Sequence, residues 1–520
     1  MSDIRNRIAH LPPDKREQLL RKMAERQQAS GTAPSNVLPA SRPARAASEP
    51  SPLSFAQQRL WFLDRLESGT TLFNLPAAFR LRGPLDVTAL GRAFNALVER
   101  HESLRTRFME QDGQPVQVAE PTLTLALAPE DLTDLPPERR EEDTRQRMAE
   151  EARRPFDLTR GPLLRTRLLR LSPEEHVLLL TMHHIVSDGW SIEVLIREVG
   201  LFYEAFVAGT APVLPALPLQ YADFARQQQE GREGGTLRRQ LDYWKARLNG
   251  APQVLELPTD WPRPAVQTFQ GAELRVELPA ALVEQLKALG RRTGATLYMV
   301  LLAAFQAVLH RYSGQDEVCV GTPSAGRSQA ELEGLIGFFL NTLVLRTDLS
   351  GDPTFLELLG RVREAAMGAF DNQDVPFEKL VEELQPRRSL SYTPLFQVML
   401  ILQKPQGRPQ LGGLALEAIK SNAGRSMFDL TLSLVEVERG GLVGHVEYST
   451  DLFEEATIAR LTQHLRTVLE AAIARPEASL ASLPLMPEAE QRQVLLDFNR
   501  THADVPLDVC FHQLFEAQAD

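Results

Sequence analysis

The stretch Met182-His183-His184-Ile185-Val186-Ser187-Asp188-Gly189-Trp190-Ser191 decides the expected fold, because a strand is predicted before it and a helix after it. The apolar run His176 to Leu180 follows turn-forming residues and has the length of a buried strand. Helical spacing then appears in four apolar residues, Ile192, Leu195, Ile196 and Val199. Ser191 is in position to cap the first turn of that helix. The sequence therefore predicts two histidines at the end of a strand, where α/β proteins often hold functional side chains.

His184 is the candidate catalyst. A neutral imidazole can accept a proton from an amine or a hydroxyl near neutral pH, because its unperturbed pKa is about 6.5. On extended backbone His183 and His184 point to opposite faces, so only one of them can face a shared pocket. We expect Asp188 to hold the loop through a buried salt bridge or backbone hydrogen bonds. Gly189 leaves room for a ligand and could present its N–H group to a developing oxyanion.

A structural role and a metal-binding role for these histidines both remain open at this point. A buried pair of histidines can be purely structural, and two histidines with an aspartate could bind a metal ion. The His-His-x-x-x-Asp spacing is unusual for zinc, and neither cysteine, Cys319 or Cys510, lies nearby in the sequence. The motif alone therefore favours catalysis over metal binding.

Length and composition restrict the class of protein. A chain of 520 residues corresponds to about three domains by ordinary domain size. A net charge of −11 and a pI near 5.6 argue against a nucleic-acid partner. Two well-separated cysteines suit a reducing compartment. The longest apolar run, Ala295 to Leu309, is too short to span a bilayer, and no segment resembles a signal peptide, so we expect a soluble, cytoplasmic protein.

The N-terminal residues are predicted to be separate from the rest of the chain. Residues 1–28 contain a charged segment with a thin apolar stripe, which indicates a short amphipathic helix. This segment resembles the helical segments that begin many synthetase subunits, which implies docking to an upstream protein, but a frayed terminus without a partner remains equally open. Residues 29–52 are rich in Ala, Ser and Pro and lack periodicity, which predicts a disordered linker.

Further motifs surround the histidines in a fixed order. Ser54 to Leu63 predicts a helix with aromatic packing and one arginine, Arg59, that needs a partner. Asp86 is expected to cap a second helix. The other motifs are Arg100 to Phe108, Tyr221 to Ala225, Ile336 to Thr342, Asn372 to Glu378 and Arg388 to Phe396. A separate segment, Thr322 to Arg327, follows the strand predicted over Glu317 to Gly321. We expect Arg327 to be the cation that meets Asp188.

The second half of the chain echoes the first. A helix is predicted over Pro279 to Leu289, an apolar helix over Leu297 to Tyr312, and a strand over Glu317 to Gly321. A further helix is predicted over Glu454 to Ala474. Two half-chains of similar size and similar element types indicate a pseudo-dimer.

Together these motifs resemble the condensation domains of nonribosomal peptide synthetases, which belong to the chloramphenicol acetyltransferase-like superfamily. The resemblance covers about residues 51–490 and includes seven ordered motifs. It implies an α/β fold of two chloramphenicol acetyltransferase-like lobes in a V, with a tunnel between them. The lobes are assigned to residues 53–228 and 229–490, and residues 491–520 resemble a linker and the start of an adenylation domain.

The resemblance also implies the reaction. An upstream carrier protein offers an aminoacyl or peptidyl thioester, and the amine of a downstream aminoacyl carrier attacks it to form a peptide bond. His184 would act as a base or position the amine, and the supporting residues would be His183, Asp188, Gly189, Arg327 and Arg59. Phosphopantetheine arms arrive on the carriers, so the resemblance implies that the chain binds no cofactor or metal itself. The motif wording most resembles domains that join an L donor to an L acceptor.

Three alternative functions share parts of this pattern. An epimerisation domain has the His-His motif but would not be followed by an adenylation-like segment. A coenzyme A-dependent acyltransferase shares the fold but needs neither that segment nor the N-terminal helix. A non-catalytic carrier-recruiting domain usually has a degraded motif, whereas the motif here is complete.

Overall fold

The computed structural model describes residues 48–66, 69–231, 235–387, 389–404, 410–419, 424–502 and 509–519. They belong to one compact unit, whereas residues 1–46 are a separate unit. The helix predicted within 1–28 and most of the predicted linker lie outside the described residues. At its end the linker prediction is wrong, because Ser51–Pro52 form strand β1 and pair with β4 (Gln114–Ala119).

The N-terminal lobe is built on a six-stranded sheet with the order β12-β13-β2-β7-β6-β5. Its first-half strands are β2 (Asn74–Arg82), β5 (Pro129–Asp131), β6 (Leu164–Ser172) and β7 (Glu175–His183). The strand predicted before the histidines is therefore confirmed as β7, and it extends to His183. All its residues after Glu175 are buried, because both faces of the sheet are covered.

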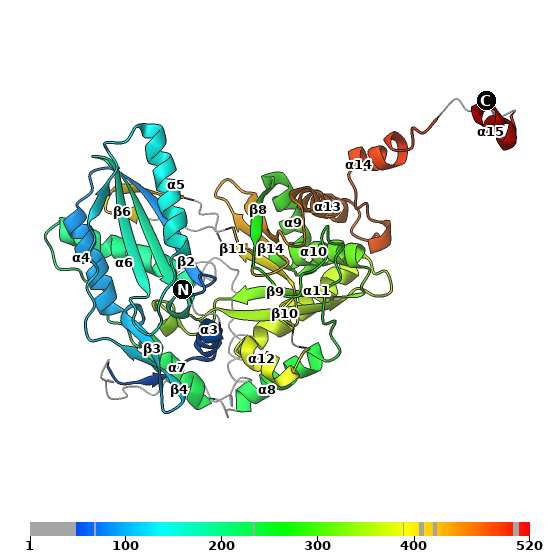
Figure 1. The fold of residues 1–520 in the computed structure, drawn as a ribbon. Coiled ribbons are helices and arrows are strands. Elements are labelled where there is room, and N and C mark those ends of the chain that lie inside the picture. The colour runs from blue at the N-terminus through cyan, green and yellow to red at the C-terminus, as the bar shows by residue number, and fades with distance from the viewer. Residues whose placement is uncertain are drawn as a thin grey trace, which may run out of the picture. The chain divides into compact units, whose positions relative to one another are not determined.

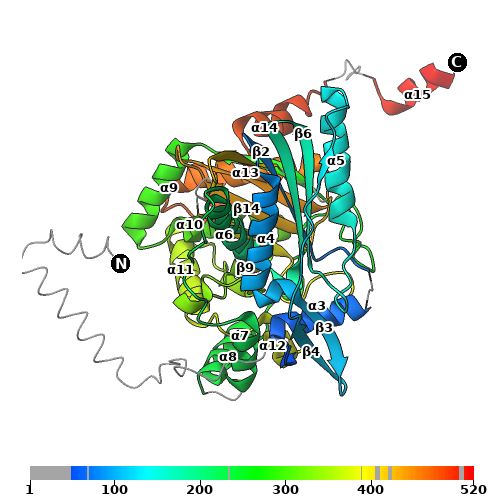
Figure 2. The same ribbon diagram turned by 90° about the vertical axis from the view of Figure 1, so that its left-hand side faces the viewer.

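Three helices cover this sheet. They are α4 (Val87–Arg100), α5 (Pro137–Arg153) and α6 (Gly189–Val207). Leu178 and Leu180 of β7 share an apolar cluster with α4 and α6, while Val177 and Leu179 share another with Met148 of α5. This alternation places α4 and α5 on opposite faces, as Figure 2 shows. The predicted cap of α4 is confirmed, since Asp86 accepts a 2.9 Å hydrogen bond from the Ala89 N–H group.

A smaller layer completes the N-terminal lobe. A three-stranded sheet has the order β1-β4-β3, with β3 at Thr106–Gln111. Helix α3 (Phe55–Leu66) and helix α7 (Tyr221–Glu230) pack near it. Helix α8 (Gly235–Leu248) then leads into the second lobe.

Figure 1 shows the second six-stranded sheet in the C-terminal lobe. Its strand order is β10-β9-β11-β14-β15-β8. Its strands are β8 (Gly271–Leu278), β9 (Glu317–Ser324), β10 (Asn341–Asp348), β11 (Val398–Gln403), β14 (Leu430–Glu436) and β15 (Leu442–Ser449). Its helices are α9 (Ala280–Thr293), α10 (Leu297–Ser313), α11 (Phe355–Asp371), α12 (Phe377–Leu384) and α13 (Glu455–Ala474). The predictions for α9, α10, β9 and α13 are confirmed.

One segment of the second half belongs to the first lobe. Strands β12 (Gln410–Leu411) and β13 (Leu414–Ile419) extend the N-terminal sheet, with β13 antiparallel to β2. Leu411 and Leu414 are buried in the same cluster as α4 and α6. A division of the chain at residue 228 therefore does not account for residues 410–419, which tie the two lobes together.

The last described elements are α14 (Glu488–Arg492), a π-helical turn at Gln493–Asp497 and α15 (Phe511–Ala519). Among the described residues, no single helix is long and apolar enough to cross a membrane. Helices α9 and α10 would meet that test only as a pair, and they are bent by 102° relative to each other.

Strand β13, which joins the sheet of the N-terminal lobe, should contribute strongly to stability. Leu414→Ala removes a side chain that is 6% exposed, and the resulting cavity should cost about 3 kcal/mol of unfolding free energy. The matched control is Leu390→Ala, because Leu390 is 71% exposed. Chemical denaturation of both variants tests this, and equal losses would contradict a packed role for β13.

Candidate functional site

The predicted histidine loop joins β7 to α6. A short 3-10 turn, His184–Val186, follows the strand, and α6 begins at Gly189. The prediction that Ser191 caps this helix is wrong. Asp188 is the N-cap, and its Oδ1 accepts the Ser191 N–H at 2.9 Å. Its extended backbone, with φ −140° and ψ −178°, turns the carboxylate over the open N–H groups of the first helical turn.

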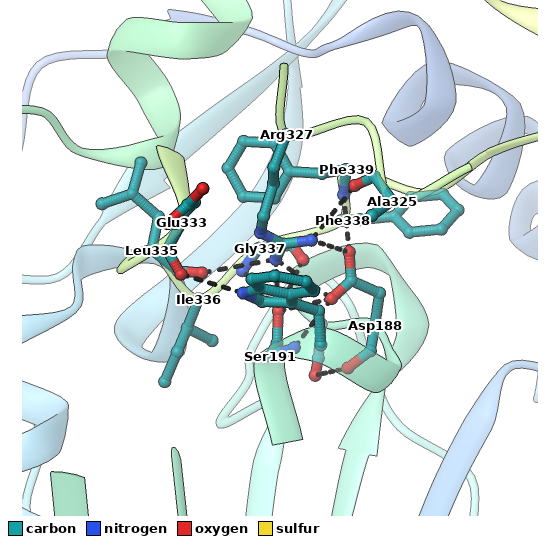
Figure 3. Close-up of polar contacts among 12 residues, drawn as sticks. Asp188, Ser191, Ala325, Arg327, Glu333, Leu335, Ile336, Gly337, Phe338 and Phe339 are labelled. Carbon is teal, nitrogen blue, oxygen red and sulfur yellow. Dashed lines mark hydrogen bonds and ion pairs between the residues drawn. The ribbon is translucent and has the colours of Figure 1, made fainter. Parts of the chain in front are cut away.

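Asp188 also forms an ion pair with Arg327 across the two lobes (Figure 3). Arg327 Nη1 donates to Oδ2 at 2.9 Å and Nη2 donates to Oδ1 at 3.1 Å. The Arg327 side chain is 1% exposed and the Asp188 side chain 2%. A two-point contact between guanidinium and carboxylate is the strongest form of this interaction, and it fixes the orientation of both groups.

The loop around Phe339 completes the contact. The Phe339 N–H donates to Asp188 Oδ2 at 3.0 Å, and its ring lies 4.3 Å from the Arg327 guanidinium. Ser191 Oγ accepts the Gly337 N–H at 3.1 Å and lies 2.9 Å from the Gly337 carbonyl oxygen. Trp190 Nε1 donates to the Glu333 carbonyl at 2.9 Å. The first turn of α6 is thus held by a loop of the other lobe.

Removal of Asp188 should be strongly destabilising. Asp188→Ala leaves the buried Arg327 charge without its counter-ion, which typically costs about 3–5 kcal/mol. The double variant Asp188→Ala, Arg327→Met should recover part of that loss, because it removes the unpaired charge. Denaturation curves of the single and double variants measure the coupling.

The matched control for this cycle is the partly exposed pair of Arg59 with Glu378, whose side chains are 40% and 23% exposed. Arg59→Ala should cost no more than about 1 kcal/mol. A soluble Asp188→Ala protein with the wild-type denaturation curve would refute the structural role of the buried pair.

His184 is the partly exposed histidine of the motif. Its Nδ1 lies 2.8 Å from the Ser187 carbonyl oxygen, which can only accept, so Nδ1 carries the proton and Nε2 carries the lone pair. No partner of Nε2 is found among the residues that the structure describes. Burial lowers the pKa of His184, and the opposing effects of Asp188 and the Ser187 carbonyl are smaller. The imidazole is therefore neutral near pH 7 and offers Nε2 as an acceptor.

His183 is the opposite tautomer, and its ring is buried. It is 1% exposed, and its Nδ1 accepts the Ile185 N–H at 3.1 Å, so Nε2 carries the proton. Nε2 has no partner in the described part of the chain. Two aromatic rings, Phe73 and Phe156, meet the imidazole edge-on. Burial lowers the pKa of His183 to about 3, with smaller effects in the same direction from His184 and Arg165. These contacts hold the His183 ring inside the fold.

The lowered pKa of His183 predicts acid sensitivity. Between pH 6.5 and 3 the unfolded chain binds a proton at this residue and the folded chain does not, so stability falls as the pH falls. His183→Asn keeps an acceptor for the Ile185 N–H and removes the titration. Between pH 7 and 5 this variant should lose roughly 2 kcal/mol less unfolding free energy than the wild type. Equal losses in urea titrations at both pH values would contradict this assignment.

Helix α3 contacts the histidine loop and helps to hold it in place. Gln57 Nε2 donates to the Ile185 carbonyl at 3.1 Å. Ser54 Oγ lies 2.9 Å from the Tyr221 hydroxyl, which donates to the Phe338 carbonyl at 2.6 Å. The sequence motifs contain Gln57 and Tyr221, but their partners lie far away in sequence, so their bracing roles were not predicted individually. Arg59 of α3 lies apart from His184 and contacts Glu378 of α12 at 3.3 Å.

Gly189 lies at the exposed start of α6. A Cβ atom built on it would have no neighbour within 4 Å, so there is open space beside this backbone. Among the described residues, no group of three or more His, Cys, Asp or Glu side chains could hold a metal ion.

Two lobes, each with a six-stranded sheet, and a histidine loop held between them define a chloramphenicol acetyltransferase-like α/β fold. The family model of the condensation domain matches residues 47–495. The chain therefore belongs to the condensation domain family of nonribosomal peptide synthetases, whose domains form amide bonds by acyl transfer.

Comparison with known proteins agrees with this assignment. The chain is 50% identical over 465 residues to one of the linear gramicidin synthase proteins of Brevibacillus parabrevis. That alignment covers 89% of this chain and 6% of the synthase protein. The X-domain from teicoplanin biosynthesis superposes with a TM-score of 0.78 at 33% identity, covering 85% of this chain and 99% of that domain. The first condensation domain of the calcium-dependent antibiotic synthetase superposes with a TM-score of 0.72 at 22% identity, covering 85% of this chain and 100% of that domain, and supports the fold alone.

Proposed function

We propose that this chain forms a peptide bond between an upstream acyl thioester and the amine of a downstream aminoacyl thioester, at His184. One observation carries the proposal. The His184 imidazole is neutral and partly exposed, and its Nε2 has no partner among the residues that the structure describes. The neighbouring polar groups of the loop, Asp188 and Ser191, are occupied by other contacts. His184 is therefore the group of this loop best able to meet a substrate.

The chemistry requires little from the protein beyond orientation. The amine nitrogen attacks the thioester carbonyl carbon, the C–S bond breaks, and the proton lost by nitrogen ends on the departing sulfur. An N–H group of the amine donates to His184 Nε2, which aims the nitrogen lone pair at the carbonyl. The lowered pKa makes His184 a weaker base. This favours a role in which the imidazole positions the amine by a hydrogen bond over one in which it takes the proton fully.

Gly189 supports the same step. Its N–H group is at the first residue of α6, where the backbone donors of a helix lack intrahelical partners. The open space beside it can admit a thioester carbonyl, and the N–H group would donate to the developing oxyanion. The phosphopantetheine arm belongs to the carrier proteins and reaches this space as part of the substrate.

The partners follow from the family. Condensation domains work with carrier proteins that bear phosphopantetheine, within a multidomain synthetase. We further propose that residues 491–520 lead into an adenylation domain, that residues 1–28 dock an upstream synthetase protein, and that the protein acts in the cytoplasm. The wording of the His-His motif and of Arg105-Thr106-Arg107-Phe108 supports an L donor and an L acceptor.

A non-catalytic recruiting domain is the second candidate. The observation that favours it is the likeness to the X-domain from teicoplanin biosynthesis, which was also solved in a complex with OxyB from that pathway. The intact arrangement at His184 favours catalysis, because a binding-only domain has no need for a free imidazole nitrogen at the lobe junction.

The test is dipeptidyl-carrier formation from two loaded carrier proteins, followed by intact-protein mass spectrometry. His184→Ala should lower the rate by about a hundredfold or more, because it removes the acceptor offered to the amine. The matched control is His512→Ala, on the exposed α15, which should keep the wild-type rate. A folded His184→Ala protein with full activity would refute the catalytic role, and an inactive wild type would support the recruiting alternative.

A further inference from the structure

Residues 336–339, in the loop between β9 and β10, are fixed on the N-terminal lobe although they belong to the second half of the chain. Each of these four residues has a hydrogen bond to that lobe. The bonds join Ser103 Oγ to the Ile336 carbonyl, Ser191 Oγ to the Gly337 N–H, the Tyr221 hydroxyl to the Phe338 carbonyl and Asp188 Oδ2 to the Phe339 N–H, at 2.7, 3.1, 2.6 and 3.0 Å. The backbone of the segment is therefore placed residue by residue against the other lobe.

The backbone at Gly337 also packs closely against the N-terminal lobe. A Cβ atom built on Gly337 would collide with the ring of Tyr221, so any other residue would push the segment away. Tyr221 is itself buried, and its hydroxyl lies 2.9 Å from Ser54 Oγ. The segment is thus held by packing as well as by hydrogen bonds, and this fixes the position of the next side chain, that of Phe338.

The Phe338 ring meets the imidazole of His184. The two ring centroids are 4.6 Å apart and the ring planes lie at 61° to each other, which is an edge-to-face contact. Phe338 is 9% exposed and belongs to the apolar cluster that contains Ile185 and Val186, the two residues after His184. An aromatic ring from the second half of the chain therefore packs directly against the proposed acceptor of the amine.

The side chain of His184 needs this second contact. Its Nδ1 lies 2.8 Å from the Ser187 carbonyl oxygen, and this hydrogen bond fixes one point of the ring. A hydrogen bond tolerates a tilt of about 30°, and a misplacement of reacting groups by about 1 Å can cost about a hundredfold in rate. The hydrogen bond alone therefore leaves Nε2 free to swing. A flat ring against the imidazole restricts that motion, because the tilt would drive the two rings into each other.

We propose that Phe338 is a positioning residue for the reaction, whose ring sets the tilt of the His184 imidazole so that Nε2 faces the attacking amine. This inference rests on the proposed function, because it concerns the same imidazole. A position that only fills the core would accept leucine at a cost in stability alone, whereas a positioning role requires a flat ring. Because the ring arrives on the β9–β10 loop, His184 is aimed only while that loop is seated on the N-terminal lobe.

The first experiment separates positioning from packing. Phe338→Leu keeps a buried apolar side chain but removes the ring. In the formation of the dipeptidyl carrier, this variant should lower the rate at saturating carrier by about tenfold and leave the carrier concentration for half-maximal rate unchanged. The matched control is Phe355→Leu, because Phe355 of α11 is buried in the core of the same lobe and loses its ring in the same way. The control should keep the wild-type rate per folded molecule.

The pH dependence of the rate gives a readout that packing alone does not move. Two titratable groups adjoin His184, the Asp188 carboxylate paired with Arg327 and the neutral imidazole of His183. Burial lowers the pKa of His184. Loss of the ring admits water beside the imidazole, so its pKa should rise and more of it should be protonated at pH 6. The ratio of the rate at pH 6 to the rate at pH 8 should therefore fall in Phe338→Leu and match the wild type in the control.

A measurement on the resting protein separates this inference from the reaction itself. Carbon-13 relaxation of labelled histidine reports the mobility of the imidazole without any substrate, and the His184 signal is assigned by its loss in His184→Ala. The imidazole should be rigid in the wild type and in Phe355→Leu, and its mobility should increase in Phe338→Leu. A more mobile imidazole in that variant supports the positioning role even if no dipeptide forms.

Phe338→Met replaces Phe338→Leu if the leucine variant does not fold, because methionine is flexible enough to fill the space of the ring. The proposal is overturned if the folded variant keeps either the wild-type rate or the wild-type pH ratio, or if Phe355→Leu lowers the rate by the same factor. It is also overturned if the imidazole stays as rigid as in the wild type. An active chain with an equally rigid imidazole would leave the proposed function intact and remove only the role of Phe338.

Discussion

The buried pair of Asp188 and Arg327 is the interaction on which the rest of the site depends. Transfer of two charges out of water is costly, and the pair persists because every oxygen of the carboxylate is used. Asp188 accepts five hydrogen bonds, from the Ser191 N–H and hydroxyl, from two Arg327 nitrogens and from the Phe339 N–H. Since these donors come from both lobes, neither lobe can satisfy Asp188 alone. The carboxylate caps α6 and joins the lobes at the same time.

Other contacts between the lobes also surround the histidine loop. Tyr221 reaches from Ser54 to the Phe338 carbonyl, and β13 carries residues of the second half into the first sheet. Phe338, whose ring packs 4.6 Å from the His184 ring, sits between these contacts. The histidine loop is therefore held from its own strand, from α3 and from the opposite lobe. Such support is what keeps a reacting group within the small tolerance that an oriented attack requires.

Much of the fold was predictable because its signals are local. The apolar run of β7, the Asp86 cap and the buried pattern of α10 each follow from neighbouring residues. The choice between Ser191 and Asp188 as the cap of α6 was not predictable from the sequence. Both residue types cap helices well, and the choice depends on the backbone of Asp188 and on Arg327. Strands β1 and β13 were missed for the same kind of reason. Their partners, β4 and β2, lie far away in sequence, and nothing in their own composition shows which sheet they join.

The candidate site divides in the same way. The His-His motif identifies His184 and His183, and the resemblance to a family supplies Arg327 as the expected partner of Asp188. A cavity between the lobes has no such signal, because its wall residues Asn74, Glu273 and Glu447 come from three strands of two lobes. Only the register of β8 against β15 makes the two glutamates neighbours.

The backbone of the loop and the burial of its side chains determine the state of the two adjacent histidines. Each imidazole is fixed as a neutral tautomer by the backbone, His183 by accepting at Nδ1 and His184 by donating there. A free carboxylate beside His184 would raise its pKa and favour the imidazolium, which has no lone pair to offer an amine. The Asp188 carboxylate does oppose the effect of burial, but burial is the larger effect and the pKa of His184 falls. Nε2 of His184 therefore stays an acceptor near pH 7, while Arg327 holds the Asp188 carboxylate in its own place.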